Sequence, residues 1–357
     1  MLRTSQDRKR HFYPILAWAA VAVVVVAAAI AGLVFVAVKM PYKGYAEESV
    51  VLNIVPRSPT VAILTSLESA GVIRDWRLGL FALRLLHPGK TLKAGEYRFA
   101  GERTPEQVIL SIIAGDVVTY RITVPEGFTA DEIFALFTSQ GFGFPTDYLY
   151  LFRRPGELEG VPPEAPSLEG FLFPETYTVT RSMSAREIVA TMTRAFARRL
   201  PANFEELARL RGLSLVAAVT LASLVEKETS IPGERPLVSA VYHNRLRRGM
   251  ALQADPTTIY ALKRLGEWRG TLARSQLGVD DPYNTYAHAG LPPGPICNPG
   301  LTALEAAVLP ADVDYLFFVA AGDGSHHFSS TFDEHGRYVA RYLESRRERR
   351  ESARGER

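Results

Sequence analysis

Two glutamates, Glu226 and Glu228, end a stretch of sequence that is otherwise almost wholly apolar. The stretch from Leu213 to Glu228 contains no proline and no glycine, which is typical of a helix buried in a protein core. Carboxyl groups near the C-terminus of such a helix lie close to the negative end of its dipole, so their pKa values should rise. A carboxylic acid that stays protonated near neutral pH can serve as a general acid.

The helical pattern does not choose between these two glutamates. Glu226 shares its side of a helical wheel with Ala222, Val219 and Leu215, and Glu228 shares its side with Leu224, Leu221 and Ala217. The alternative to catalysis is that the two side chains cap the solvent end of the helix or form ion pairs with Lys227 or Arg235. Ion pairs also explain charge at helix ends.

The segment LQADPTTIY, residues 252–260, presents Gln253, Asp255 and Thr257 next to a turn and before a predicted helix. Polar residues in such a turn sequence are typical of loops that line a cleft. Because Asp255 precedes a proline, its backbone should be extended. We therefore expect Asp255 to be the N-cap of the helix that follows.

The segment DPYNTYAHAGLPPGPICNPG, residues 281–300, contains too many prolines and glycines for a helix or a central strand. It is predicted to form a long ordered loop. Tyr283, Asn284 and Tyr286 supply flat faces and amide groups of the kind that bind sugar rings. The alternative is that these residues only hold the loop in shape.

Residues 315–335 are predicted to form a β-hairpin, with a buried strand, a Gly-Asp-Gly turn and a second strand. His326, His327 and His335 do not predict a zinc site, because adjacent strand residues point to opposite faces and the spacing matches no metal motif. The single cysteine, Cys297, excludes an intramolecular disulfide and a cysteine-based metal centre, so a packing role is expected for it. No phosphate loop, dinucleotide-binding glycine pattern or nucleophile elbow occurs, and no cofactor is expected.

Several helix starts can be predicted upstream of these segments. Capping boxes predict them at Thr104 with Gln107, Thr129 with Glu132, and Ser184 with Glu187. Two similar passages, beginning at residues 54 and 123, each predict a strand, a Val-Pro turn and an amphipathic helix. Residues 141–166 are rich in Gly, Pro and aromatic residues, which favours an irregular connection. Together these elements predict an α+β fold.

The N-terminal region contains a continuous uncharged apolar run, Ile15 to Val38, long enough to cross a hydrocarbon core of roughly 30 Å. Four basic residues precede it: Arg3, Arg8, Lys9 and Arg10. By the positive-inside rule the short N-terminus is cytoplasmic and the remainder is exported. The alternative is a cleaved signal peptide, with small residues for cleavage between Ala27 and Gly32. The net charge of +3 is small, so no nucleic-acid partner is predicted.

Four segments that follow this anchor in order resemble the endolytic murein transglycosylase family of bacteria. They are LASLVEKET (221–229), LQADPTTIY (252–260), PYNTYAHAGLPPGPICNPG (282–300) and FVAAGDGSHHFS (318–329). LEGFLFPETY (168–177) also resembles that family, and VPRSPT (55–60) resembles its LysM-like module. The resemblance extends from the anchor to about Tyr342, and the Arg-rich tail after it is not expected of the family.

With this resemblance, the chain is expected to have six parts. They are a cytoplasmic N-terminus (1–14), a transmembrane helix (15–38), a linker (39–48), a small LysM-like α+β module (49–120), a larger α+β catalytic domain (121–342) and a charged tail (343–357). The resemblance implies that Glu226 is the catalytic residue. It implies substrate contacts from Gln253, Asp255, Asn284, Tyr286 and His326. It also implies an inner-membrane location, with the catalytic part on the extracytoplasmic side.

The implied reaction is cleavage between N-acetylmuramic acid (MurNAc) and N-acetylglucosamine (GlcNAc) within peptidoglycan strands. Glu226 would protonate the glycosidic oxygen, and its carboxylate would take the proton of the MurNAc C6 hydroxyl, which closes a 1,6-anhydro ring. A link to glycan synthesis implies termination of nascent strands, with peptidoglycan synthases as partners. One alternative is a hydrolase whose second carboxylate is Glu169, Glu228 or Asp255. The other is a non-catalytic, peptidoglycan-binding scaffold.

Overall fold

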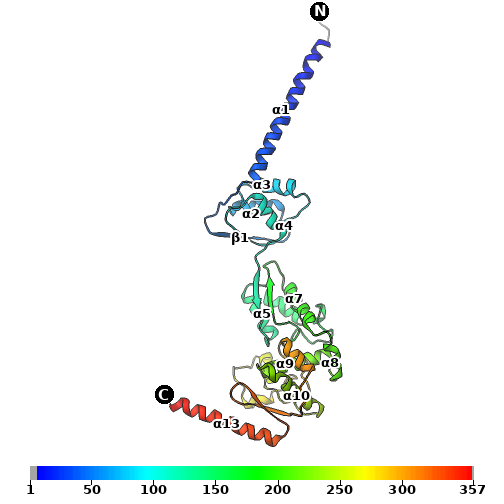
Figure 1. The fold of residues 1–357 in the computed structure, drawn as a ribbon, viewed down its shortest axis with the longest axis vertical. Coiled ribbons are helices and arrows are strands. Elements are labelled where there is room, and N and C mark those ends of the chain that lie inside the picture. Colours follow the sequence, from blue (N-terminus) through cyan, green and yellow to red (C-terminus); the bar gives the residue numbers. More distant parts are fainter. Residues whose placement is uncertain (1–5, 356–357) are drawn as a thin grey trace, which may run out of the picture. The chain divides into compact units, whose positions relative to one another are not determined.

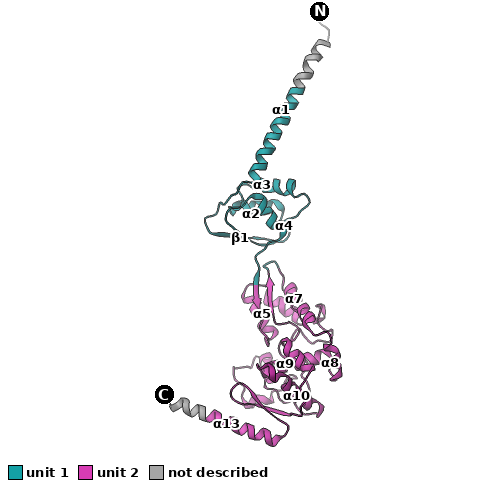
Figure 2. Cartoon of the chain, viewed as in Figure 1, with its two compact units in different colours: residues 1–120, 180–182 teal, residues 121–179, 183–357 magenta. Residues whose placement is uncertain are grey.

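The structure is a computed structural model that describes residues 6–355. The chain has the predicted α+β fold and divides into two compact units (Figures 1 and 2). The first unit contains residues 1–120 and 180–182, and the second contains residues 121–179 and 183–357. Arg3 of the predicted cytoplasmic segment and residues 356–357 of the predicted tail lie outside the described residues.

Helix α1 (Gln6–Val38) carries the predicted apolar run. Its residues Ala17–Val38, with a mean hydropathy of 3.1, are long and apolar enough to cross a membrane. The helix ends at Val38, whose side chain is buried in the core of the first unit. The predicted linker that follows is bonded to the same unit, because Tyr42 exchanges two backbone hydrogen bonds with Arg103.

The first unit contains a two-stranded antiparallel sheet, in which Ser49 of β1 (Ser49–Ile54) pairs with Ala100 of β2 (Gly95–Ala100). Its other elements after α1 are α2 (Thr60–Ser69), α3 (Trp76–Phe81), the π-helical turn η1 (Ala82–Leu86) and α4 (Pro105–Ala114). One core joins the strands to these helices, and it includes Leu64, Leu67, Tyr97, Phe99, Val108 and Ile112. The predicted strand–turn–helix passage around residue 54 is confirmed.

The unit boundary falls in β3 (Tyr120–Thr123), which pairs with β4 (Thr176–Val179). The helices between and after these strands are α5 (Ala130–Ser139), α6 (Pro145–Phe152), η2 (Pro155–Glu157), α7 (Ala185–Arg199), α8 (Phe204–Leu210), α9 (Leu215–Glu228), η3 (Pro232–Glu234), α10 (Arg235–Arg247), α11 (Asp255–Leu265), η4 (Arg274–Gly278) and α12 (Leu301–Val308). The hairpin β5 (Phe317–Ala320) and β6 (His326–Ser329) and the helix α13 (Phe332–Gly355) complete the described chain.

Helix α9 is the buried helix that the sequence predicts, and α8, α10, α11 and α12 pack against it. Its residues from Ala218 to Val225 are all buried. The Ser214 side chain accepts a hydrogen bond from the backbone N–H of Ala217 and so starts the helix. The helix therefore presents its only charged residues in its last turn, beside segments from several other elements.

The predicted capping boxes at Thr104, Thr129 and Ser184 are all present. The predicted irregular connection over residues 141–166 is wrong in part, because α6 lies within it. Pro145 stands in the first turn of α6, where a missing N–H costs no hydrogen bond. The Tyr148 side chain is buried and stacks on Phe134, with ring centroids 4.9 Å apart, so tertiary packing stabilises this short helix.

Candidate active site

Most of the predicted site residues line one cavity of about 310 Å³ in the second unit. The lining residues are Glu228, Arg245, Leu252, Gln253, Asp255, Tyr286, Phe318, Val319, Ala320, His326 and His335. They come from the end of α9, from α10, from the start of α11, from the loop 281–300, from the β5–β6 hairpin and from α13. The structure thus brings together the segments that carry the sequence motifs. Glu226 and Asn284 do not line this cavity.

Glu228 contributes a protonatable carboxyl group to the cavity. The Tyr242 hydroxyl of α10 donates a hydrogen bond of 2.7 Å to its Oε1. Burial is the main cause that raises the pKa of Glu228 to about 7. The nearby Asp255 also acts to raise it, while the hydrogen bond from Tyr242 and the charge of Arg245 act to lower it. A carboxyl group with this pKa is partly protonated at neutral pH, which is the state that general acid catalysis requires.

Arg245 is buried and is held by backbone carbonyl groups. Its Nε donates to the carbonyl of Leu316 at 2.7 Å, and its Nη1 donates to those of Ala251 and Leu252 at 3.2 and 2.8 Å. These bonds fix a positive charge in the wall of the cavity. Sequence reasoning missed Arg245; its spacing of three residues from Tyr242, which puts both on one side of α10, was the available signal.

Asp255 is the first residue of α11, so its prediction as the N-cap is wrong, and Ala254 occupies that position. Its Oδ1 instead accepts a hydrogen bond of 2.7 Å from the Tyr286 hydroxyl. Gln253 is exposed beside this pair and has a φ of 51°, a left-handed conformation that is uncommon for a residue other than glycine. Its N–H donates to the carbonyl of Thr285, which helps to hold the strained residue in place.

Asn284 is fully buried, and both ends of its amide are bonded within the protein. Its Nδ2 donates to the carbonyls of Leu277 and Val279, at 2.9 and 2.8 Å. Its Oδ1 accepts from the Thr258 hydroxyl at 2.8 Å and from the Tyr286 N–H at 3.1 Å. Asn284 therefore holds the loop and positions Tyr286, which was the alternative that the sequence left open.

His326 is held by Glu234, a residue that sequence reasoning missed. The Glu234 carboxylate accepts the His326 backbone N–H at 2.8 Å, while Nδ1 of the ring lies 2.7 Å from Oε2. The Thr229 hydroxyl, just after α9, donates to the same Oε2 at 2.9 Å. Burial alone would raise the pKa of Glu234, but the hydrogen bonds from His326 and Thr229 lower it overall.

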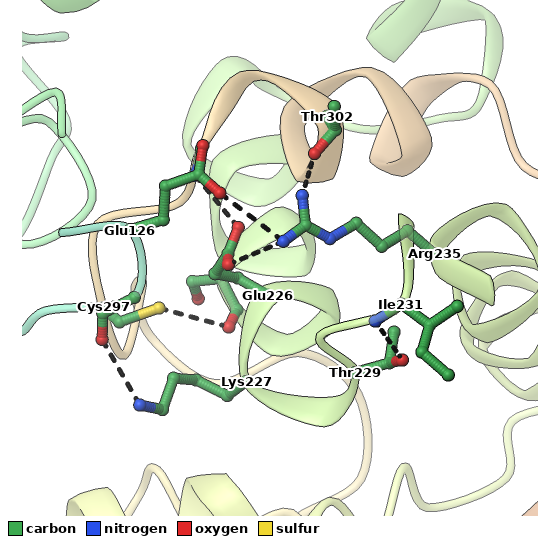
Figure 3. Close-up of polar contacts among 11 residues, drawn as sticks. Glu126, Glu226, Lys227, Thr229, Ile231, Arg235, Cys297 and Thr302 are labelled. Atoms are coloured by element: carbon green, nitrogen blue, oxygen red, sulfur yellow. Dashed lines mark hydrogen bonds and ion pairs between the residues drawn. The ribbon is translucent and has the colours of Figure 1, made fainter. Parts of the chain in front are cut away.

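Glu226 lies in a different environment, shown in Figure 3. Its Oε1 forms an ion pair of 2.9 Å with Arg235, and each of these side chains is only 7% exposed. Its Oε2 accepts the backbone N–H of Gly300, the N-cap of α12, at 3.0 Å. The pKa of Glu226 is raised overall: burial and the nearby carboxylate of Glu126 raise it, while the Gly300 N–H and Arg235 act against that rise. The predicted alternative, an ion pair with Arg235, is present.

Glu169 lines a second cavity, of about 480 Å³. Burial raises the pKa of Glu169 to about 8, although its carboxyl accepts hydrogen bonds from the Ala130 N–H, Asn298 Nδ2 and the Tyr260 hydroxyl. It does not line the cavity that contains Glu228, whereas Asp255 does. Within the described residues, no cluster of three or more His, Cys, Asp or Glu side chains is arranged to hold a metal ion.

Known proteins resemble this chain over most of its length. The endolytic murein transglycosylase of Streptococcus pneumoniae is 28% identical over 338 residues, which cover 86% of this chain and 61% of that protein. The protein of the same name from Bacillus subtilis is 36% identical over 183 residues, which cover 51% of this chain and 50% of that protein. The chain therefore spans less than two thirds of the length of both relatives.

A crystal structure of a YceG-like protein from Listeria monocytogenes is also similar. It is 31% identical in sequence and has a TM-score of 0.54, and the match covers 82% of this chain and 99% of that chain. The model of the YceG-like family matches residues 52–341, a range that includes every residue of the cavity described above. The chain belongs to the YceG-like family.

Proposed function

We propose that the chain is a peptidoglycan lytic transglycosylase that cleaves the MurNAc–GlcNAc bond within glycan strands and leaves 1,6-anhydro-MurNAc ends. The observation that carries the proposal is Glu228, a carboxyl group with a pKa of about 7 in a cavity that four of the predicted site residues also line: Gln253, Asp255, Tyr286 and His326. The names of the two relatives, both endolytic murein transglycosylases, support the same activity.

The geometry favours Glu228 over Glu226 as the general acid. The Glu226 carboxylate accepts hydrogen bonds from a guanidinium and from a backbone N–H, and both donors stabilise its ionised form. Glu228 has one neutral donor, the Tyr242 hydroxyl, and it faces the cavity with Asp255 and Tyr286. The catalytic role of Glu226, which the resemblance to the family motif implies, thus stays a prediction, and the experiment below compares it with the proposal for Glu228.

In the proposed reaction, Glu228 donates its proton to the glycosidic oxygen, and the bond from that oxygen to C1 of MurNAc breaks. The C6 hydroxyl of the same MurNAc then bonds to C1, and its proton passes to a base in the cavity. Because this hydroxyl takes the place of water, a second carboxylate that activates water is unnecessary. Gln253, Asp255 and Tyr286 present amide, carboxylate and hydroxyl groups that hydrogen-bond sugar hydroxyl and acetamido groups.

The test is mass spectrometry of uncrosslinked glycan strands after incubation with the full chain in detergent. Wild type, Glu228→Gln and Glu226→Gln are compared, with circular dichroism to confirm folding. We expect internal fragments with 1,6-anhydro ends from the wild type and a loss of at least about 10³-fold in rate for Glu228→Gln. We expect Glu226→Gln to retain cleavage but to unfold more readily, because the buried Arg235 loses its buried carboxylate partner and keeps only the half-exposed Glu126, 3.6 Å away.

Other outcomes would overturn parts of this proposal. Retained cleavage by Glu228→Gln with loss in Glu226→Gln would assign the acid to Glu226. Fragments with reducing ends would indicate a hydrolase, for which Asp255, the other carboxylate that lines the same cavity, is the candidate second carboxylate. A folded wild type that cleaves nothing would favour the peptidoglycan-binding scaffold.

The remaining parts of the expected organisation are proposals of the same kind. Residues 49–120 are proposed to be a LysM-like module that binds glycan, and residues 121–342 to be the catalytic domain. The span Ala17–Val38 and the positive-inside rule support an inner-membrane anchor with both parts on the extracytoplasmic side. There the enzyme would terminate nascent strands beside peptidoglycan synthases, and cross-linking in growing cells tests that association.

A further inference from the structure

The β5–β6 hairpin presents a histidine to the cavity with its ring held on several sides. Glu234 binds Nδ1 of His326, and the ring meets Phe318 edge-on, with centroids 5.6 Å apart and planes at 89°. Phe328, two residues along the same strand, lies 6.3 Å from the ring. The imidazole therefore has one fixed orientation in the wall of the cavity that Glu228 also lines.

The hydrogen bond to Glu234 also fixes the tautomer of His326. An ionised carboxylate only accepts hydrogen bonds, so Nδ1 of the ring must carry the proton that lies between them. In the neutral ring, Nε2 then carries the lone pair. Among the described residues, the only hydrogen bond that the ring forms is the one from Nδ1 to Glu234, so Nε2 is left for the substrate. A carboxylate that orients an imidazole in this way makes a proton acceptor of the other ring nitrogen.

A network of hydrogen bonds links this histidine to the helix that carries the proposed acid. Thr229, the C-cap of α9 and the neighbour of Glu228, donates to the Glu234 oxygen that Nδ1 of His326 contacts. The backbone N–H of His326 donates to the other oxygen of Glu234. The end of α9, η3 and β6 are thus joined through one carboxylate, which ties the position of His326 to that of Glu228.

We propose that His326 is the base that accepts the proton of the MurNAc C6 hydroxyl, which separates the acid and the base of the proposed reaction between two side chains. The inference rests on the proposed function. Glu228 gives its proton to the glycosidic oxygen as the bond to C1 breaks. The C6 oxygen forms the new bond to C1, and its proton moves to Nε2 of His326. The reaction ends with Glu228 ionised and His326 protonated, and proton exchange with water restores both.

With the acid and base steps divided between Glu228 and His326, neither side chain has to reach two different oxygen atoms of the substrate. With Glu228 alone, one group would have to reach the leaving oxygen and then the C6 oxygen of the neighbouring sugar. With His326, a separate group from a different element is already present for the second transfer. Glu234 has the role of a positioning residue, because it touches the imidazole and acts on the substrate only through it.

The adjacent His327 is a matched control for an experiment on His326. It lies on the same strand but stacks on Tyr338 of α13, with ring centroids 4.5 Å apart, and it does not line the cavity. The experiment measures cleavage of uncrosslinked glycan strands by the full chain in detergent. It compares wild type with His326→Ala, His326→Gln, His327→Ala and Glu228→Gln, each with and without added imidazole, and folding is checked by thermal unfolding.

We expect both His326 variants to lose at least about 10²-fold in kcat, the usual contribution of a general base, with KM close to that of the wild type. Imidazole should restore at least about tenfold activity to His326→Ala, which has a space for it. It should restore none to His326→Gln, where the longer side chain fills that space, or to Glu228→Gln. The His327→Ala variant should cleave at the wild-type rate.

Three results would overturn the inference. Cleavage by folded His326→Gln within a few-fold of wild type would mean that a carboxylate takes the C6 proton, and the proposed function would stand without this base. If His326→Ala is folded but inactive and imidazole does not restore its activity, the role of His326 is structural and not that of the base. Absence of cleavage by the wild type would instead refute the proposed function and this inference together.

Discussion

Glu226 and Glu228 are separated by one residue, yet their carboxyl groups have different partners. Arg235 and the Gly300 N–H bind Glu226, whereas Glu228 receives one hydrogen bond from a neutral hydroxyl. The position in the helix is nearly the same for both, so the helix dipole affects both similarly. Residues that follow in α10 and α12 create the difference, and for this reason the periodicity of α9 alone did not reveal it.

The raised pKa of Glu228 predicts a pH-dependent stability. Its folded-state pKa is about 7 and its ordinary value is 4.5, so the folded protein binds this proton more tightly than the unfolded chain does. The unfolding free energy should therefore fall as pH rises from about 4.5 to about 7, by roughly 3 kcal/mol for this group. Glu228→Gln removes the effect and should be more stable than wild type above pH 7.

Urea unfolding of wild type and Glu228→Gln at several pH values measures this difference. Contributions from other groups, such as Glu169, are present in both proteins and largely cancel. The difference should be small near pH 4.5, grow up to about pH 7 and then level off. A difference that is constant across this range would show that Glu228 does not carry the raised pKa.

At the scale of elements, the loop 281–300 is ordered by hydrogen bonds and not by regular structure. Asn298 joins it to the segment that follows Ser167: its Oδ1 accepts the N–H groups of Gly170 and Leu172, at 3.0 and 2.8 Å. Its Nδ2 donates to the Phe128 carbonyl and to Glu169. One buried amide thus fixes three segments around the end of α9.

Gly170 shows how closely these segments approach. Its φ is 89°, and a Cβ atom there would lie 2.5 Å from the Pro295 ring. Gly170→Ala should therefore destabilise the protein by roughly 2–4 kcal/mol, from the strained backbone and the forced contact together. Thermal unfolding measures the change. The matched control, Gly336→Ala in α13, meets no atom within 4 Å, so it should leave the melting temperature equal or slightly raised.

Much of this arrangement was predictable from local sequence. The capping boxes, the buried α9, the hairpin and the loop 281–300 each have a signal within about twenty consecutive residues. The missed features depend on contacts between distant segments. Helix α6 forms because Tyr148 packs on Phe134, and Glu234 becomes part of the site only because the hairpin brings His326 to it. The sequence motifs that resemble the family contain most of the residues that line the cavity. Only the burial and the charged neighbours seen in the structure separate the roles of residues such as Glu226 and Glu228.

At the scale of the whole molecule, the apolar helix and the first unit share a core. Val38 is fully buried at the end of α1, and Lys39 forms an ion pair with Glu106 of α4. Backbone hydrogen bonds of Tyr42 and Gly44 hold the next residues to the same unit. The segment expected to be a linker therefore provides little free chain between the predicted membrane span and the folded module.

This contact predicts that a change at the end of α1 alters the stability of the first unit. Val38→Ala should lower its unfolding free energy by about 2 kcal/mol, from the lost methyl groups and the resulting cavity. Val36→Ala, at a position that is 57% exposed, should have little effect. Thermal unfolding of the full chain in detergent measures both. Equal melting temperatures for the two variants would mean that α1 and the first unit are independent.

The same contact determines how force travels through the protein. A flexible linker would extend first when a glycan strand bound to the module is pulled. The membrane helix would then carry little force until the linker was fully extended. Here Val38 is buried in the first unit, and Tyr42 and Gly44 are hydrogen-bonded to it, so little chain is free to extend. Force on the first unit therefore passes directly to α1. If the module binds glycan and α1 spans the membrane, as proposed, the bilayer and the growing wall are then mechanically coupled through a single helix.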